Sequence, residues 1–117
     1  IDLIEVDRIR RSIQSAHFCE RVFGAQERQQ LAARSMAAES AAACFAAKEA
    51  FGKALGCGVR GFSLAEVQLL REPSGRPYLS LCGRALLLAE ERGLEFAVSV
   101  THTKQYAAVV VAAEKKA

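Results

Sequence analysis

The 117-residue sequence has no apolar run close to the roughly 20 residues that a membrane-spanning helix needs, and we therefore expect no contact with a membrane. It has no basic segment followed by an apolar core and a small-residue cleavage site, so we expect no export signal and predict a cytoplasmic location. No repeat, low-complexity tail or linker rich in Pro, Gly and Ser divides it. Since compact domains usually run to about 100–150 residues, we expect residues 1–117 to form one domain.

Missing motifs argue against several chemistries. There is no Gly-rich phosphate loop of the Walker type, no nucleophile elbow and no C-x-x-C pair that would indicate a zinc ribbon. Tryptophan is absent, and 16 Lys and Arg against 13 Asp and Glu give a net charge of only +3. That balance argues against a nucleic-acid partner but suits an acidic protein. The cysteines have apolar or small neighbours and are expected to be buried free thiols: Cys19, Cys44, Cys57 and Cys82.

Helix-forming residues dominate the first half of the chain, and alternating or continuous apolar residues dominate the second half. The pattern predicts helices over 8–16, 25–34, 35–55 and 83–92, and strands over 1–6, 63–70, 76–82, 95–101 and 106–113. Asp7 and Ser35 are the expected N-caps of the helices 8–16 and 35–55. The order predicts an α+β fold in which N-terminal helices, including the long one, pack on a mostly antiparallel sheet.

The last predicted strand is apolar at every position from Tyr106 to Ala113. Such a run is typical of a strand that is buried on both faces. A domain of this size has a modest core, because it leaves much of its surface exposed. We therefore expect self-association to complete the burial of this segment.

Asp2 has the same strand parity as Ile4 and Val6, so alternation directs its carboxylate towards an apolar face. A carboxylate placed there needs a cation, because an unpaired charge loses several kcal/mol or more of hydration on burial. An ion pair with an Arg or Lys, or an exposed strand end, would explain Asp2 without any function.

Phe45, Glu49 and Lys53 are spaced four residues apart and share one face of the long helix. Two interpretations remain open. Glu49 and Lys53 can form a surface pair worth about 0.2–0.5 kcal/mol. Alternatively, because aromatic residues stand beside them, the carboxylate can hold a divalent ion while the ammonium meets a phosphate oxygen.

His102 follows an alternating strand and opens the turn that contains Lys104. A histidine at a strand end is commonly structural. Together with Ser99 and Thr101, however, His102 and Lys104 would offer several hydrogen-bond donors to an anion.

Arginines give the first helical region a basic flank, since Arg8 and Arg11 lie near one another at about 100° per residue. Arg21 adds a further positive charge. The alternative is an ordinary solvated face.

Taken together, four segments resemble the small bacterial 4′-phosphopantetheinyl transferases, the holo-[acyl-carrier-protein] synthase family. The matching segments are I-D-L-I-E-V at 1–6, F-A-A-K-E-A at 45–50 with K-A-L-G at 53–56, G-R-P-Y at 75–78, and V-S-V-T-H at 98–102. The resemblance covers nearly the whole chain. It implies transfer of the phosphopantetheine arm of coenzyme A to a serine of an acyl carrier protein, with release of adenosine 3′,5′-bisphosphate.

The resemblance also implies Mg²⁺ as cofactor and a homotrimer whose active sites lie between subunits. Asp2 and Glu49 would be the metal ligands, and Lys53 and His102 would lie near the diphosphate of coenzyme A. The base that removes the serine proton is either Glu49 or a water molecule on the metal. The carrier protein is acidic, so it would dock on Arg8, Arg11 and Arg21. Further residues expected to contact coenzyme A are Lys48, Arg76, Ser99, Thr101 and Lys104.

One position departs from the family. Members usually have an arginine before F-A-A-K-E-A that contacts the 3′-phosphate of coenzyme A, and here it is Cys44. Either another cation such as Arg76 or Lys104 replaces it, or coenzyme A binds more weakly. Two other functions stay open: a non-catalytic module that binds coenzyme A or an acidic protein, and a purely structural trimer-forming subunit.

Overall fold

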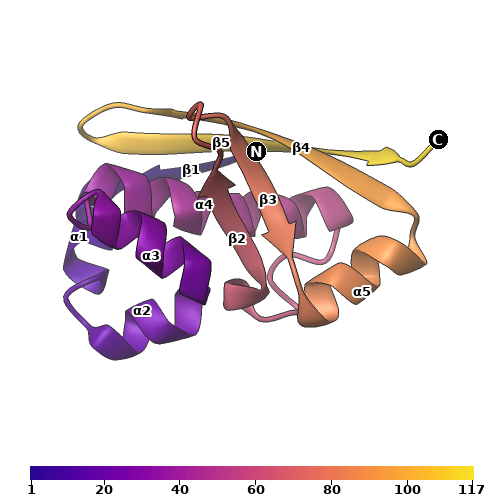
Figure 1. Cartoon of the computed structure of the whole chain (residues 1–117), viewed down its shortest axis with the longest axis horizontal. Helices are drawn as coiled ribbons and strands as arrows, with labels where there is room; N and C mark the ends of the chain where they lie inside the picture. The colour runs from indigo at the N-terminus through magenta and orange to yellow at the C-terminus, as the bar shows by residue number, and fades with distance from the viewer.

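A long helix, α4, runs through the middle of the molecule, and two separate antiparallel sheets pack against it (Figure 1). The computed structural model describes all residues from 1 to 117 and has the predicted α+β class. Its elements are β1 (Asp2–Glu5), α1 (Val6–Ser12), α2 (Ala16–Val22), α3 (Ala25–Ala33), α4 (Ala38–Leu55), the 3-10 helix η1 (Leu64–Glu66), β2 (Val67–Arg71), β3 (Pro77–Leu81), α5 (Gly83–Glu91), β4 (Leu94–His102) and β5 (Tyr106–Lys115).

Helix α4 is rich in alanine, which has the highest helix propensity and takes up little space. Most of its residues are buried, and their small side chains let strands approach it closely. At Gly52, a Cβ atom would overlap the backbone carbonyl of Gly58, so only glycine lets the following loop fold back onto the helix. The helix ends at Gly56, whose φ of 81° is the left-handed conformation common at helix C-termini.

The N-terminus of α4 differs from the prediction. The helix begins at Ala38, with Ala37 as N-cap, and not at Ser35. Ser35 and Met36 both have positive φ, 56° and 51°, because the chain reverses there between α3 and α4. Two consecutive non-glycine residues in this conformation are not signalled by the local sequence, which reads as continuous helix.

The larger sheet has the strand order β1-β5-β4, with every pair antiparallel. Along β5 the buried residues Ala107 and Val109 alternate with the exposed residues Tyr106 and Val110. The prediction that this strand is buried on both faces is therefore wrong within one chain. Helix α4 covers one face, and the other is open.

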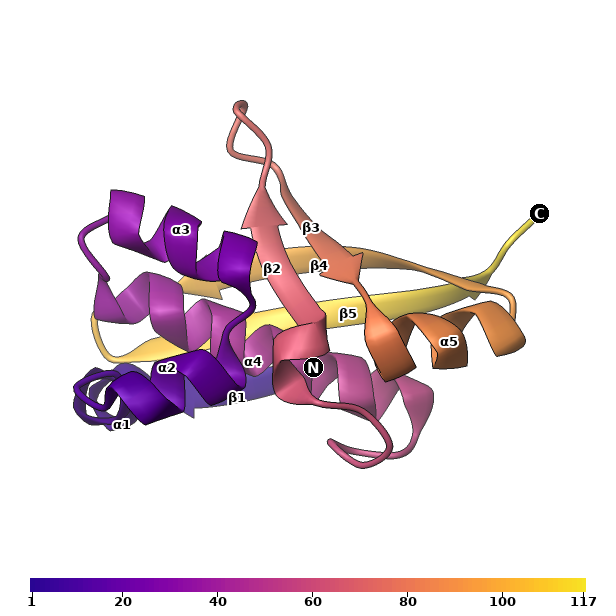
Figure 2. The ribbon, with the colours of Figure 1, turned by 60° about the horizontal axis from the view of Figure 1, so that its bottom comes forward.

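The smaller sheet is the β2–β3 hairpin, which crosses the β4–β5 ribbon at a steep angle (Figure 2). Strand β2 packs on α4, and β3 packs on β4. The strand predicted to start at residue 63 starts at Val67 instead. The residues before it form η1, because Ser63 and Glu66 close a capping box.

The N-terminal helices also differ in detail from the prediction. Helix α1 starts at Val6, so Asp7 lies in its first turn and is not its cap. Residues 16–22, expected to be a connecting segment, form α2, whose N-cap Ser15 accepts a hydrogen bond from the backbone N–H of Phe18 at 3.2 Å.

None of the helices combines the length and the apolar character that crossing a membrane requires.

A fully buried ion pair joins α3, α4 and β2. The Nζ atom of Lys48 donates to Oε1 of Glu27 at 2.6 Å and to the carbonyl of Val67 at 2.6 Å. Glu27 also accepts from the backbone N–H groups of Leu69 and Gly24, at 2.8 Å and 3.1 Å. Both charged side chains are completely inaccessible to solvent, so each charge depends on the other.

Removing one partner of this pair should destabilise the fold strongly. We expect Lys48→Met to lower the free energy of unfolding by roughly 3–5 kcal/mol, because it leaves the Glu27 carboxylate buried without a counter-charge. The double variant Lys48→Met with Glu27→Gln should recover part of the loss. Urea unfolding followed by circular dichroism measures both changes. Lys116→Met, at an exposed position, is the control. A Lys48→Met protein as stable as this control would contradict the role of the pair.

Candidate functional site

Two charged residues that are 51 positions apart in the sequence meet where β1 packs on α4. The Nζ atom of Lys53 donates to Oδ1 of Asp2 at 3.0 Å and to the carbonyl of Ile1 at 3.1 Å. The Asp2 side chain is only 14% exposed, and Lys53 is 54% exposed. Ile4 is buried and Leu3 is exposed, so the predicted orientation of Asp2 and its need for a cation are both confirmed.

Glu49 lies one helical turn before Lys53 on the same face of α4. It is half-buried, and its carboxylate makes no hydrogen bond or ion pair within the chain. The surface pair of Glu49 with Lys53 considered from the sequence does not form, because Lys53 pairs with Asp2 instead. Glu49 is thus a carboxylate beside the Asp2–Lys53 pair that is free to bind a ligand.

The donors at this junction fit a hard divalent cation. The chain has no group of three or more His, Cys, Asp and Glu residues that could enclose a metal by itself. Two carboxylates with room for water and phosphate oxygens are what Mg²⁺ takes, whereas zinc sites use three or four protein ligands. Oδ2 of Asp2 and both oxygens of Glu49 are without hydrogen-bond partners in the chain.

His102 and Lys104 lie elsewhere in the same chain. With Thr103 they line an open groove at the β4–β5 turn, opposite Arg10 and Glu39, which are bonded to each other at 3.5 Å. Strand β5 separates them from β1. The chain therefore does not bring His102 next to Asp2, since β5 lies between their strands.

Ser99 and Thr101 are on the opposite face of the sheet. Strand β4 alternates, so the half-buried Val98 and Val100 face α4 while Ser99 and Thr101 are exposed on the outer face. Asp2 points to the α4 side, as its register partner Val109 does. These two hydroxyls do not join Asp2 in a single chain.

The expected contact of Lys48 with coenzyme A is a wrong prediction. Its ammonium has no exposed surface and is held by Glu27 and the carbonyl of Val67. The F-A-A-K-E-A pattern alone does not show whether Lys48 binds a ligand or is buried, because the partners of Lys48 lie on α3 and β2, far away in the sequence. Lys48 is therefore a structural residue.

Arg76 stands at the turn of the β2–β3 hairpin, where its guanidinium bonds to the exposed Glu72 at 3.3 Å. Cys44 lies on the buried face of α4 that meets β2, and its thiol donates to the carbonyl of Leu69 at 3.8 Å. Burial, with a smaller contribution from the negative charge of Glu27, raises the pKa of the Cys44 thiol far above its ordinary value. Cys44 therefore stays uncharged and provides no cation or nucleophile.

The three arginines expected to dock the carrier are all exposed on α1 and α2. The guanidinium of Arg8 lies 5.6 Å from the ring centre of Phe45, a cation–π distance. Arg11 and Arg21 form no salt bridge within the chain. These helices thus present a basic surface with two unpaired guanidinium groups.

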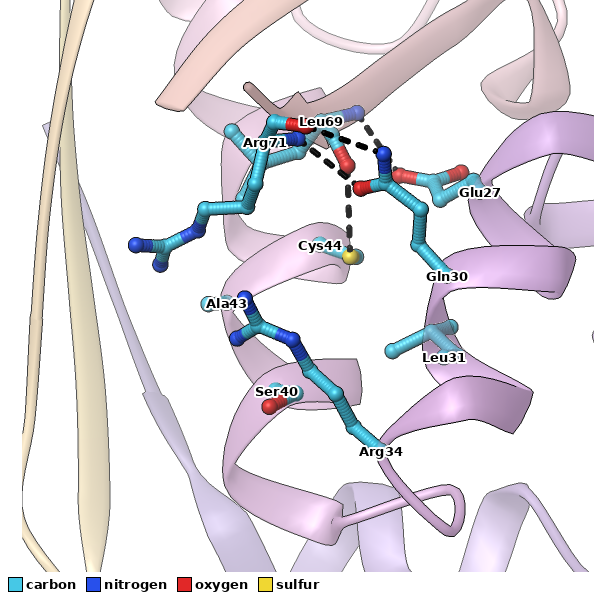
Figure 3. Close-up of a pocket in the computed structure, with 9 residues that line it drawn as sticks. All are labelled: Glu27, Gln30, Leu31, Arg34, Ser40, Ala43, Cys44, Leu69 and Arg71. Carbon is cyan, nitrogen blue, oxygen red and sulfur yellow. Dashed lines mark hydrogen bonds between the residues drawn. The ribbon is translucent and has the colours of Figure 1, made fainter. Parts of the chain in front are cut away.

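A pocket between α3, α4 and β2 was not predicted from the sequence (Figure 3). Arg34, Ser40 and Arg71 are among its lining residues. Arg34 is the last residue of the helix predicted over 25–34, and Arg71 directly follows the strand predicted over 63–70, so neither position carries a local signal. Only the packing of β2 on α3 brings them together.

Known proteins share the sequence pattern and the fold of this chain. The sequence model of the 4′-phosphopantetheinyl transferase superfamily matches residues 1–111, and the chain belongs to this superfamily. It is 43% identical over 116 residues to the holo-[acyl-carrier-protein] synthase of Treponema denticola, covering 97% of this chain and 94% of that protein. It is also 43% identical over 116 residues to the Moorella thermoacetica enzyme of the same name, covering 97% and 91%.

Solved structures of the same enzyme share the fold. The Neisseria meningitidis structure superposes with a TM-score of 0.89 at 27% identity, covering 97% of this chain and 94% of that chain. A Bacillus anthracis structure in complex with CoA (3′,5′-ADP) gives a TM-score of 0.81 at 28% identity, covering 98% and 93%. The resemblance that the four sequence segments indicated is confirmed.

The cysteines are all free, as predicted, but only Cys44 is fully buried, and Cys82 is exposed. We expect iodoacetamide at pH 8 to alkylate Cys82 in the native protein and to leave Cys44 unmodified, because the buried thiol is inaccessible and its pKa is raised. Peptide mass mapping after a timed reaction measures each site, and the same reaction in urea is the control in which both thiols react. Equal rates at the two sites in the native protein would contradict the burial of Cys44.

Proposed function

We propose that this chain transfers the 4′-phosphopantetheine group of coenzyme A to a serine of an apo acyl carrier protein and releases adenosine 3′,5′-bisphosphate. The serine oxygen forms a bond to phosphorus, the bond from that phosphorus to the leaving bisphosphate breaks, and the serine proton is released. The observation that carries the proposal is the junction of Asp2, Glu49 and Lys53 in a member of this superfamily.

Asp2 and Glu49 are the residues that would hold Mg²⁺, since both offer unpaired carboxylate oxygens at one junction. A divalent ion there supplies positive charge that stabilises the diphosphate oxygens as the bond breaks. The Lys53 ammonium is more than half exposed and is positioned to donate to an anion that approaches Asp2. Lys53 thereby contributes a second cation on the leaving-group side.

A homotrimer with active sites between subunits is part of the proposal. The outer sheet face exposes Leu3, Tyr106 and Val110 at 64%, 44% and 45%, and nothing in the chain covers it. His102 and Lys104, expected near the diphosphate, are separated from Asp2 in one chain by β5. A neighbouring copy that covers the outer face would also supply the groups that one chain lacks.

The basic surface of α1 and α2 would receive the carrier protein, which is acidic, through Arg8, Arg11 and Arg21. Attraction between complementary charges speeds association more than it adds affinity, and salt screens it. The four unpaired thiols suit a reducing compartment such as the cytoplasm.

The transfer is tested by incubating the protein with coenzyme A, MgCl₂ and an apo carrier protein, and weighing the carrier by mass spectrometry. We expect a mass gain of one phosphopantetheine group. Asp2→Asn and Glu49→Gln should each slow the gain by roughly 10²–10³-fold, because each loses charge that stabilises the transition state. Glu91→Gln, on the exposed surface of α5, is the matched control. If the wild-type protein leaves the carrier unmodified, the proposed transferase activity is rejected. If coenzyme A still binds in that case, the chain is a non-catalytic binding module. Full activity in either site variant overturns its role as a metal ligand.

Docking is tested at the two unpaired arginines. Arg11→Ala and Arg21→Ala should each raise KM for the carrier about 3-fold to 10-fold at low salt and leave kcat unchanged, because a long-range attraction is lost. In 0.5 M NaCl the difference from wild type should shrink. Arg84→Ala is the control. Arg84 lies at the start of α5, and its guanidinium donates to the carbonyl of Gly61. A fall in kcat without a change in KM would contradict a docking role.

A further inference from the structure

Lys53 is the only cation that pairs with Asp2, and the two side chains differ in their exposure to water. The Nζ atom of Lys53 donates to Oδ1 of Asp2 at 3.0 Å, and no other cation of the chain forms a salt bridge with this carboxylate. The Asp2 side chain is 14% exposed, and that of Lys53 is 54% exposed. The carboxylate therefore depends on a neighbouring cation, whereas the ammonium can return to water at little cost.

A divalent ion on Asp2 competes with this ion pair. Asp2 and Glu49 carry two negative charges, which balance one divalent ion. If the Lys53 ammonium stays on Asp2, three positive charges face those two negative charges. Positive charges that share one carboxylate repel each other, and more strongly where water is partly excluded. The ion therefore binds more favourably once Lys53 has left Asp2.

The Lys53 side chain is held by few contacts. Apart from Asp2 it bonds only to the carbonyl of Ile1, at 3.1 Å, and it forms no ion pair with Glu49 one helical turn earlier. Its four-carbon stem is flexible and ends in three rotatable donors. A diphosphate bound beside the ion offers this ammonium new acceptor oxygens and about two further negative charges.

We propose that Lys53 couples the binding of the metal to the binding of the diphosphate by exchanging partners. Its ammonium is the counter-ion of Asp2 until a diphosphate binds; it then moves to the phosphate oxygens and leaves the carboxylate to the metal. Lys53 thus weakens metal binding in the protein alone and no longer does so when the diphosphate is present. Because such coupling is reciprocal, the metal strengthens binding of the diphosphate by the same factor. This inference rests on the proposed function for its metal and its diphosphate.

A lysine that only holds Asp2 in position makes the opposite prediction. Its removal would free the Asp2 side chain and weaken metal binding, with or without a diphosphate. The direction in which metal affinity changes in the protein alone therefore distinguishes a competing cation from a positioning residue.

The test measures binding of Mn²⁺, which takes the same oxygen ligands as Mg²⁺ and whose unbound form is quantified by electron paramagnetic resonance. In the protein alone, Lys53→Met should bind Mn²⁺ roughly 3-fold to 10-fold more tightly than wild type, because the competing charge is gone. Lys53→Gln, which is neutral but polar, should show the same gain. Lys53→Arg retains the charge and should stay within about 2-fold of wild type. With saturating coenzyme A and no carrier protein, the gain of the two neutral variants should disappear or reverse. A titration of coenzyme A with Mn²⁺ in the absence of protein gives the background.

Two further variants complete the experiment. Asp2→Asn should lose most of the bound Mn²⁺, which locates the ion, and Lys116→Met, at an exposed position, should match wild type. The proposal is overturned if the neutral Lys53 variants bind Mn²⁺ no more tightly than wild type in the protein alone, or if their gain is the same with coenzyme A. It is also overturned if Asp2→Asn binds Mn²⁺ as wild type does, since the ion then lies elsewhere. These measurements use no carrier protein, so their outcome is independent of whether a carrier is modified in the transfer assay.

Discussion

The buried pair of Lys48 and Glu27 sets the position of α4, and the other features of the molecule depend on that position. A charge with no access to water must keep its partner, so Lys48 can point only towards Glu27 and the carbonyl of Val67. This fixes the rotation of α4 about its own axis relative to α3 and β2. Because Glu49 is the next residue, the same rotation turns its carboxylate away from this buried cluster.

Lys53 is five residues after Lys48, which on an α-helix is a rotation of about 140°. It consequently contacts β1 on a different side of the helix from the one that Lys48 presents to β2. The closely packed alanines allow both sheets to approach, so one helix supports the Lys48–Glu27 pair and the Lys53–Asp2 pair on different faces. The Asp2–Glu49–Lys53 junction combines two carboxylates with one cation at the surface, whereas the Lys48–Glu27 pair has no access to solvent.

Local signals were sufficient for the class of fold, for four of the five helices and for the orientation of Asp2, because helix propensity and strand alternation act over a few residues. They failed at Lys48, whose burial depends on a glutamate 21 residues earlier and on β2. They also failed at Ser35 and Met36, where tertiary packing imposes positive φ on residues that favour helix. Strand alternation by itself places Ser99 and His102 on opposite faces, so an anion site that combines the two within one chain conflicts with the pattern of β4.

The open face of β5 connects the proposed assembly with the proposed chemistry. An apolar strand at the centre of a sheet has two faces to cover, and α4 covers only one. The exposed face carries Leu3, Tyr106 and Val110, and Ser99 and Thr101 lie on the same side. If a neighbouring copy covers that face, the apolar surface is removed from water, and hydroxyls directed away from Asp2 in their own chain come to lie between subunits. The same contact between subunits would then explain two features of the single chain. It would cover the exposed apolar face of β5, and it would bring together the site residues that β5 separates.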